Sequence, residues 1–159
     1  MHVFRRAKKN SPTWMLALLL LTLALPAQAQ NSNVREVGAY TIFYDVVPTA
    51  FLDPQIAQAY SVTRSRGLGL LRITVMKKDE QGHLQPVSQP RVSGQAGNLA
   101  GQTSPLSFRE VQVGRGDGYS TISTFRYSHE TAMRFNLRVH YTSGKPAEEL
   151  HFVRRLSID

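Results

Sequence analysis

The sequence predicts an all-β protein, an antiparallel β-sandwich of about seven to eight strands with one short helix. One observation is the alternation in residues 132–141, which places Met133, Phe135, Leu137 and Val139 on one face and polar residues between them. A second is the regular spacing of β-branched and aromatic segments between turns rich in Gly, Pro, Asp and Ser. Short strands without helices between them are typical of a sandwich, and an open barrel is the alternative.

The expected strands are 40–47, 68–77, 84–87, 91–93, 106–113, 119–127, 132–141 and 150–158. Pro86 and Pro90 interrupt the ladder hydrogen bonds of their segments, so we expect 84–87 and 91–93 at a sheet edge. Residues 94–102 contain three glycines and read as a loop. Residues 114–118 are typical of a glycine-rich hairpin turn. A phosphate-binding loop is not expected, because such a loop would have to be followed by a helix. The Arg115-Gly116-Asp117 tripeptide suggests an adhesion motif, but it arises easily by chance in such a turn.

The helix is predicted over residues 54–60, inside an irregular segment from Tyr44 to Gly69. Asp53 is a good N-cap, and Pro54 suits the first helical position. Two turns do not persist alone in water, so the segment must dock through apolar side chains. The side chains expected to dock are Phe51, Leu52, Ile56 and Tyr60.

Arg64 follows this helix where the chain turns back into the fold. A guanidinium can satisfy several acceptors there, so we expect Arg64 to be anchored on backbone carbonyls or on Asp53. The alternative is that Arg64 binds a partner.

Residues 1–29 read as a secretory signal peptide. Arg5, Arg6, Lys8 and Lys9 precede an apolar run over 14–25, and Ala27 and Ala29 occupy the small-residue positions of a cleavage site. Cleavage would make Gln30 the first residue and would leave no transmembrane segment. The mature protein would then be a single β-sandwich domain over residues 30–159, which we expect in the periplasm of a Gram-negative bacterium. The sequence has no Cys, so this domain must be stable without disulfides.

Cleavage also changes the charge. Four of the 19 Lys and Arg precede residue 30 while all 11 Asp and Glu follow it, so 15 basic residues face 11 acidic ones, a net +4. This modest charge, together with the expected compartment, argues against a nucleic-acid partner.

The helix-containing segment resembles a family of secreted bacterial proteins, domain of unknown function 4426. The resemblance is carried by Tyr44, Thr49-Ala50-Phe51-Leu52, Pro54, Ile56-Ala57, Ala59-Tyr60, Arg64-Ser65 and the run 70–75. It implies an immunoglobulin-like sandwich in the bacterial envelope with no assigned activity, and it transfers no functional residue.

No G-x-S-x-G, H-E-x-x-H or P-loop pattern occurs, so we expect a protein that is not an enzyme, with no catalytic residues and no cofactor. A surface metal site from His140, His151 and Glu149 is conceivable if the strands around them pair so that His140 faces His151 or Glu149. Solvated histidines are the commoner arrangement, and we expect no metal.

The strongest binding candidate is a basic outer sheet face that contains Arg134, Arg138 and His140, with His151 and Arg155 on the next strand. The alternative is a solvated face balanced by Glu130, Glu148 and Glu149. We expect a non-enzymatic binding module for an envelope protein or an anionic envelope polymer. The other hypotheses are a small-ligand protein or enzyme with a pocket at residues 48–67, and a chaperone-like protein that pairs an edge strand with a client.

Overall fold

The computed structural model describes residues 33–157 apart from 115, 117 and 129–130. In these ranges it contains ten strands, one 3-10 turn and one α-helix. Their bounds are β1 Val34–Val37, β2 Tyr40–Pro48, η1 Thr49–Phe51, α2 Pro54–Ala59, β3 Leu68–Lys78, β4 Leu84–Pro86, β5 Arg91–Asn98, β6 Thr103–Pro105, β7 Arg109–Val113, β8 Gly118–Arg126, β9 Thr131–His140 and β10 Glu148–Leu156.

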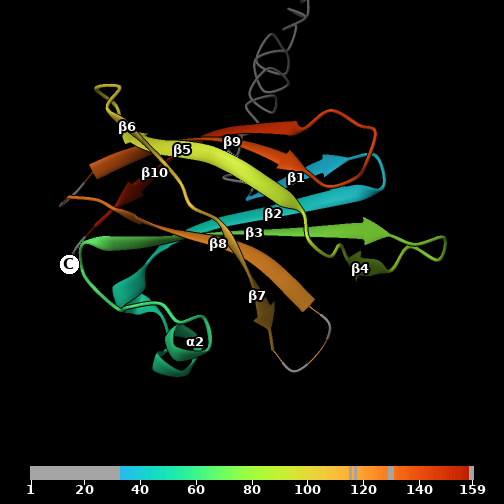
Figure 1. Cartoon of the computed structure of the whole chain (residues 1–159), viewed down its shortest axis with the longest axis horizontal. Helices are drawn as coiled ribbons and strands as arrows, with labels where there is room; N and C mark the ends of the chain where they lie inside the picture. Colours follow the sequence, from blue (N-terminus) through green and yellow to red (C-terminus); the bar gives the residue numbers. More distant parts are fainter. Residues whose placement is uncertain (1–32, 115, 117, 129–130, 158–159) are drawn as a thin grey trace, which may run out of the picture. The chain divides into compact units, whose positions relative to one another are not determined.

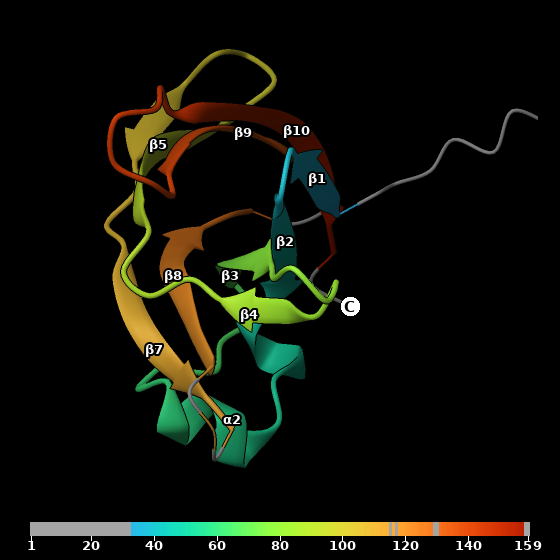
Figure 2. The ribbon, with the colours of Figure 1, turned by 90° about the vertical axis from the view of Figure 1, so that its right-hand side faces the viewer.

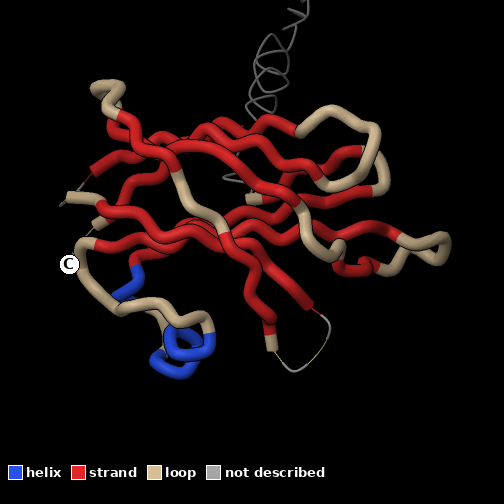
Figure 3. The backbone as a smooth tube through the Cα atoms, viewed as in Figure 1, coloured by secondary structure: helices blue, strands red, loops and turns tan. Residues whose placement is uncertain are grey.

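The strands form two antiparallel sheets, which confirms the predicted sandwich (Figure 1). One sheet has six strands in the order β1-β2-β3-β8-β7, with β4 added to β3, and the other has four in the order β10-β9-β5-β6. Figure 2 shows the four-stranded sheet above the six-stranded one, with α2 beneath the latter. Among the described residues, helical structure occurs only at this place (Figure 3). None of the described helices is long and apolar enough to cross a membrane.

The main core lies between the sheets. Alternation along the strands brings Ile42, Ile73, Phe135 and Leu137 together there, each at most 1% exposed. Phe135 stacks on Phe152 with ring centroids 5.0 Å apart, so aromatic rings from neighbouring strands help to fill the space. Burial of this apolar surface is the main favourable term that holds the two sheets together.

A second, smaller core lies on the opposite, outer face of the six-stranded sheet. Leu70 of β3, Val111 of β7 and Ile122 of β8 are buried there by Tyr60 and Val62, which follow α2. The run of apolar residues at the start of β3 therefore reflects a strand that is covered on both faces.

Strand β5 corrects the expectation of a short edge strand followed by a loop. It runs to Asn98 and lies between β9 and β6. A Cβ at Gly94 would stand 2.3 Å from the carbonyl oxygen of Asn136, and one at Gly97 would stand 2.3 Å from that of Gln102. The two glycines thus mark close approach of neighbouring backbones and not a loop.

Two of the short strands, β1 and β6, were not predicted. β1 is a largely exposed four-residue segment in which no strand was expected, and β6 contains Pro105. β7 begins three residues later than expected, at Arg109. β4 lies at an edge as predicted, because it pairs only with β3. The turn between β7 and β8 includes Arg115 and Asp117, which lie outside the described residues.

Candidate functional site

The predicted basic side chains meet on the outer face of the four-stranded sheet. Arg134 and Arg138 of β9 alternate with the buried Phe135, Leu137 and Val139, so both are exposed. The register places Arg91 of β5 opposite His140, an addition that sequence reasoning missed because residues 91–93 had no assigned partner strand. We call this surface the basic face; it consists of Arg91, Arg134, Arg138, His140, Glu149, His151 and Arg155.

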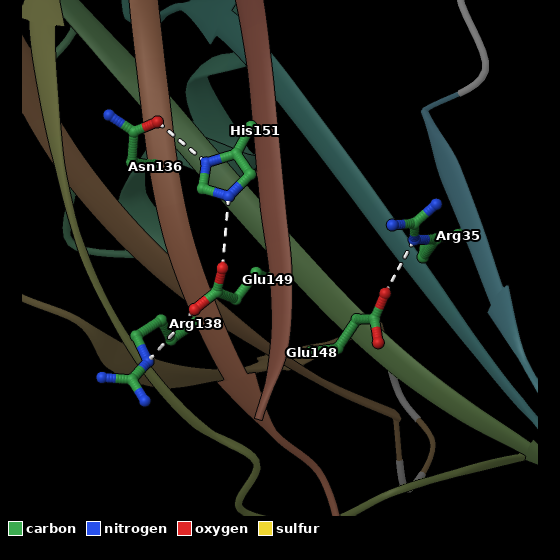
Figure 4. A network of polar contacts seen from close by, with 6 residues as sticks. All are labelled: Arg35, Asn136, Arg138, Glu148, Glu149 and His151. Atoms are coloured by element: carbon green, nitrogen blue, oxygen red, sulfur yellow. Dashed lines mark hydrogen bonds and ion pairs between the residues drawn. The ribbon is translucent and has the colours of Figure 1, made fainter. Parts of the chain in front are cut away.

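Glu149 is the acidic residue of the basic face. Its carboxylate lies 4.0 Å from Nε of Arg138 and 3.5 Å from Nε2 of His151 (Figure 4). On the other side of the imidazole, Nδ1 of His151 is 2.9 Å from Oδ1 of Asn136. These groups are exposed, so both contacts contribute little to stability, and the side chains of Arg138 and His151 stay accessible to an anionic partner.

Glu148 does not balance this face, contrary to one of the alternatives above. Its side chain accepts a hydrogen bond of 2.8 Å from Nε of Arg35 on β1 (Figure 4). Neighbouring residues of a strand point to opposite faces, so Glu148 contacts the six-stranded sheet through Arg35, while Glu149 lies on the basic face beside Arg138. Glu130 lies outside the described residues. The described part of the basic face therefore carries four arginines and two histidines against one glutamate.

The strands do not bring His140, His151 and Glu149 together as the surface metal site would require. Both expected registers are wrong: Glu149 pairs with Arg138 and His151 with Asn136, because β9 ends at His140 and β10 already begins at Glu148. His140 instead lies opposite Arg91 on β5. Within the described ranges, no three His, Asp or Glu side chains are grouped closely enough to hold a metal ion.

Arg64 lies far from the basic face in the fold, after α2. Its Nη2 donates to the carbonyl oxygen of Ala50 at 2.9 Å, so the expected anchoring on a backbone carbonyl is confirmed, with Ala50 as the acceptor in place of Asp53. Asp53 instead caps α2, where its Oδ1 accepts from the backbone N–H of Gln55 at 2.7 Å.

The docking of the helical segment is only partly as predicted. Tyr60 is 4% exposed and Leu52 packs on the second core, but Phe51 is 67% exposed and Ile56 43% exposed. The reason is the 3-10 turn η1, which buries Thr49 completely and thereby directs Phe51 outward. Val62, which was not among the expected docking residues, is buried in the second core.

Two further residues hold this segment and were not identified from the sequence. The hydroxyl of Thr49 donates to the Ser65 carbonyl at 3.1 Å and accepts from the Ser65 N–H at 2.9 Å. Arg109 at the start of β7 donates to the carbonyls of Tyr60 and Ser61. Such pairs connect positions 16 and about 50 residues apart, which local patterns cannot show.

An open groove of about 770 Å³ lies on the outer face of the six-stranded sheet. Its apolar lining includes Val34, Phe43, Met76, Pro86 and Val113. Polar groups in it are the loose ion pair of Asp45 and Arg72, at 3.7 Å, and the hydroxyls of Thr74 and Ser120, which are 2.6 Å apart.

The pocket suggested at residues 48–67 is small. A cavity of about 200 Å³ is lined by Ser61, Thr63 and Arg109 among others, but by neither Asp53 nor Arg64. His129, another residue that could have contributed, lies outside the described residues.

Solved structures that share the fold include the following two. A DUF4426 family protein from Pseudomonas aeruginosa PAO1 is 28% identical and superposes with a TM-score of 0.64, covering 79% of this chain and 94% of that one. FetP from uropathogenic Escherichia coli strain F11, which was expressed recombinantly in the periplasm, is 9% identical with a TM-score of 0.52, covering 78% and 92%. The second likeness concerns the fold alone. Among curated proteins, no sequence matches the chain.

The family model described as Domain of unknown function (DUF4426) matches residues 34–159, which includes every described strand and the helical segment. The resemblance noted in the sequence is therefore confirmed: the chain belongs to the DUF4426 family.

Proposed function

We propose that the protein is a non-enzymatic binding module that engages an anionic polymer or an acidic envelope protein through the basic face. The observation that carries this proposal is the concentration of charge on one sheet face, where Arg91, Arg134, Arg138 and Arg155 outnumber Glu149. Arginine forks suit carboxylate, sulfate and phosphate groups, and a one-sign surface attracts such a partner from a distance.

The flatness of a sheet favours an extended partner over a small molecule. Arg134 and Arg138 are four residues apart on β9, and at about 3.3 Å per residue their Cα atoms are roughly 13 Å apart. That spacing suits repeating negative groups along a polymer or a chain segment. The cavity near residues 48–67 is smaller than the roughly 300–1,000 Å³ of most ligand pockets, so the geometry favours the binding module over the small-ligand alternative.

The proposed place of action is the periplasm, because residues 1–29 have the pattern of a cleaved signal peptide. Protein recovered from the periplasm of an expressing Gram-negative host should begin at Gln30 by mass spectrometry. An intact Met1 in the membrane fraction would contradict this.

Retention on an immobilised anionic polysaccharide such as dextran sulfate, at low salt, tests the binding role. The double reversal Arg134→Glu/Arg138→Glu should abolish retention while leaving the free energy of unfolding within about 1 kcal/mol of wild type, because both side chains are exposed. The control Lys78→Glu/Arg126→Glu changes the net charge equally at exposed positions outside the basic face and should be retained. Loss of retention by both double variants would refute the proposal. So would a wild-type protein that is not retained.

A further inference from the structure

The basic face contains a hollow of about 380 Å³ that crosses the strands of the four-stranded sheet. Cross-strand pairs set four of its lining residues in one row across β6, β5, β9 and β10, namely Pro105, Gln95, Asn136 and His151. Arg138 and Glu149, which pair with each other, line the hollow from the next row. Neighbouring strands are about 4.8 Å apart, so the first row spans roughly 14 Å, enough for a short stretch of an extended polymer.

Three side chains around the hollow have hydrogen-bonding groups that no described residue engages. The Glu149 carboxylate makes loose contacts of 4.0 Å to Arg138 and 3.5 Å to His151 but accepts no hydrogen bond among the described residues (Figure 4). In the same part of the chain, the Arg138 guanidinium donates no hydrogen bond and the Gln95 amide forms none. A carboxylate accepts, a guanidinium donates and an amide does both, so a ligand in the hollow would meet unused acceptors as well as unused donors.

The presence of Glu149 in the hollow decides which anionic groups fit. Sulfate and fully ionised phosphate groups only accept hydrogen bonds, so the Glu149 carboxylate would repel them and keep its own lone pairs unpaired. Hydroxyl groups both donate and accept, so a sugar ring can donate to Glu149 and accept from Gln95. A carboxylate on the same sugar would find the guanidinium of Arg138, whose planar fork matches its two oxygens.

The surroundings of the hollow remain cationic, so a negatively charged glycan is favoured over a neutral one. Arg134 lies on the same face of β9, four residues before Arg138, and Arg91 and His140 pair with each other on the same sheet face. These side chains attract polyanions of any kind from a distance. The hollow adds the hydrogen-bonding pattern that distinguishes one polyanion from another.

We propose that this hollow is the recognition site for an acidic polysaccharide, a glycan whose units carry both hydroxyl and carboxylate groups. This inference rests on the proposed function and specifies the partner of the basic face as a glycan, in place of an acidic protein. Arg138 pairs with the carboxylate of one sugar unit, while Glu149 and Gln95 exchange hydrogen bonds with its hydroxyl groups. Arg134, further along β9, provides the cation for a carboxylate of a neighbouring unit.

The test compares binding to two immobilised polymers, measured by biolayer interferometry at low salt, with protein produced from the full-length chain and purified as the host processes it. Polygalacturonate carries a carboxylate and free hydroxyl groups on each unit, whereas poly-L-glutamate carries the carboxylate without hydroxyl groups. Wild type should bind polygalacturonate at least about tenfold more tightly, the factor expected for one additional hydrogen bond to a charged group.

Glu149→Leu gives the sharpest result, because charge and hydrogen bonding predict opposite effects. Loss of a negative charge from the basic face would tighten the binding of both polymers if charge alone decided. If Glu149 accepts from sugar hydroxyls, the variant should bind polygalacturonate about tenfold more weakly and poly-L-glutamate more tightly. Gln95→Leu leaves the charge unchanged and should weaken the binding of polygalacturonate more than that of poly-L-glutamate. The control Glu36→Leu removes an acid from an exposed strand position on the other sheet and should leave the preference between the polymers as in wild type.

All three positions are exposed, so the variants should fold as wild type does, with unchanged midpoints of thermal unfolding. Equal binding of the two polymers by wild type would overturn the inference and favour an acidic protein as the partner. Tighter binding of both polymers by Glu149→Leu would also overturn it, and in either case the charge-driven binding of the proposed function would stand. A wild type that binds neither polymer would overturn it as well, and retention on dextran sulfate would then show whether the proposed function fails with it.

Discussion

Replacing Thr49 by valine tests how the helical segment is fixed to the sandwich. Valine has nearly the shape of threonine, so the packing of this fully buried side chain is kept while its two hydrogen bonds to Ser65 are lost. Each such bond contributes about 1 kcal/mol net. The Ser65 N–H loses its partner in a half-buried place, whereas the Ser65 C=O keeps the 3.4 Å hydrogen bond that it accepts from the Leu68 N–H. We therefore expect a loss of about 2 kcal/mol, which lowers the midpoint of thermal unfolding by roughly 6–12 °C for a domain of this size.

The assay combines thermal unfolding with amide hydrogen exchange. In Thr49→Val the Ser65 amide should lose its protection, whereas Thr49→Ser keeps the hydroxyl and should keep that protection despite the loss of a buried methyl group. An unfolding midpoint of Thr49→Val within about 2 °C of wild type, or a Ser65 amide as protected as before, would refute the reasoning that these two bonds hold the segment.

Two other substitutions probe neighbouring contacts. Arg64→Ala should lower the thermal midpoint by a few degrees, because it removes one exposed hydrogen bond of about 1 kcal/mol to Ala50. The control Arg66→Ala removes no such bond among the described residues and should leave the midpoint unchanged. Equal midpoints for the two variants would show that Arg64 does not stabilise the fold. Gly69→Ala should lower the free energy of unfolding, measured by chemical denaturation, by about 1–3 kcal/mol, because its Cβ would stand 2.3 Å from the Phe125 ring. In the control Gly67→Ala the nearest neighbour of the Cβ is 3.7 Å away, so its stability should stay close to wild type. Similar losses in both variants would contradict the packing argument.

Elements with a strong local pattern were predictable. The alternation of Met133 to Val139 located β9 to within one residue, and Asp53 with Pro54 located the start of α2. The same alternation identified Arg134 and Arg138 as an exposed pair, because the side opposite a buried row must face outward. The anchoring of Arg64 on a backbone carbonyl was also predicted, but its acceptor, the carbonyl of Ala50 14 residues earlier, was not.

What the sequence could not provide were the long-range pairings. The register of β9 and β10 depends on where the intervening loop ends. The observed register differs by two residues from the one that would pair His140 with Glu149, and by four from the one that would pair His140 with His151. Gly94 and Gly97 resembled a loop because the backbones that crowd them belong to distant segments. The Phe51 side chain points outward because Thr49 is buried against Ser65. No local sequence pattern predicts that contact.

The salt dependence of binding to the anionic polysaccharide, measured for wild type and for Arg134→Gln/Arg138→Gln, tests the role of the basic face most directly. Glutamine removes the charges without placing a new acid opposite Glu149, which pairs with Arg138 across the strands. Each arginine that contacts the polymer releases counterions on binding, so the slope of log affinity against log salt should be shallower by about two in the variant. Equal slopes for the two proteins would mean that the polymer binds elsewhere or that the basic face is only a solvated surface.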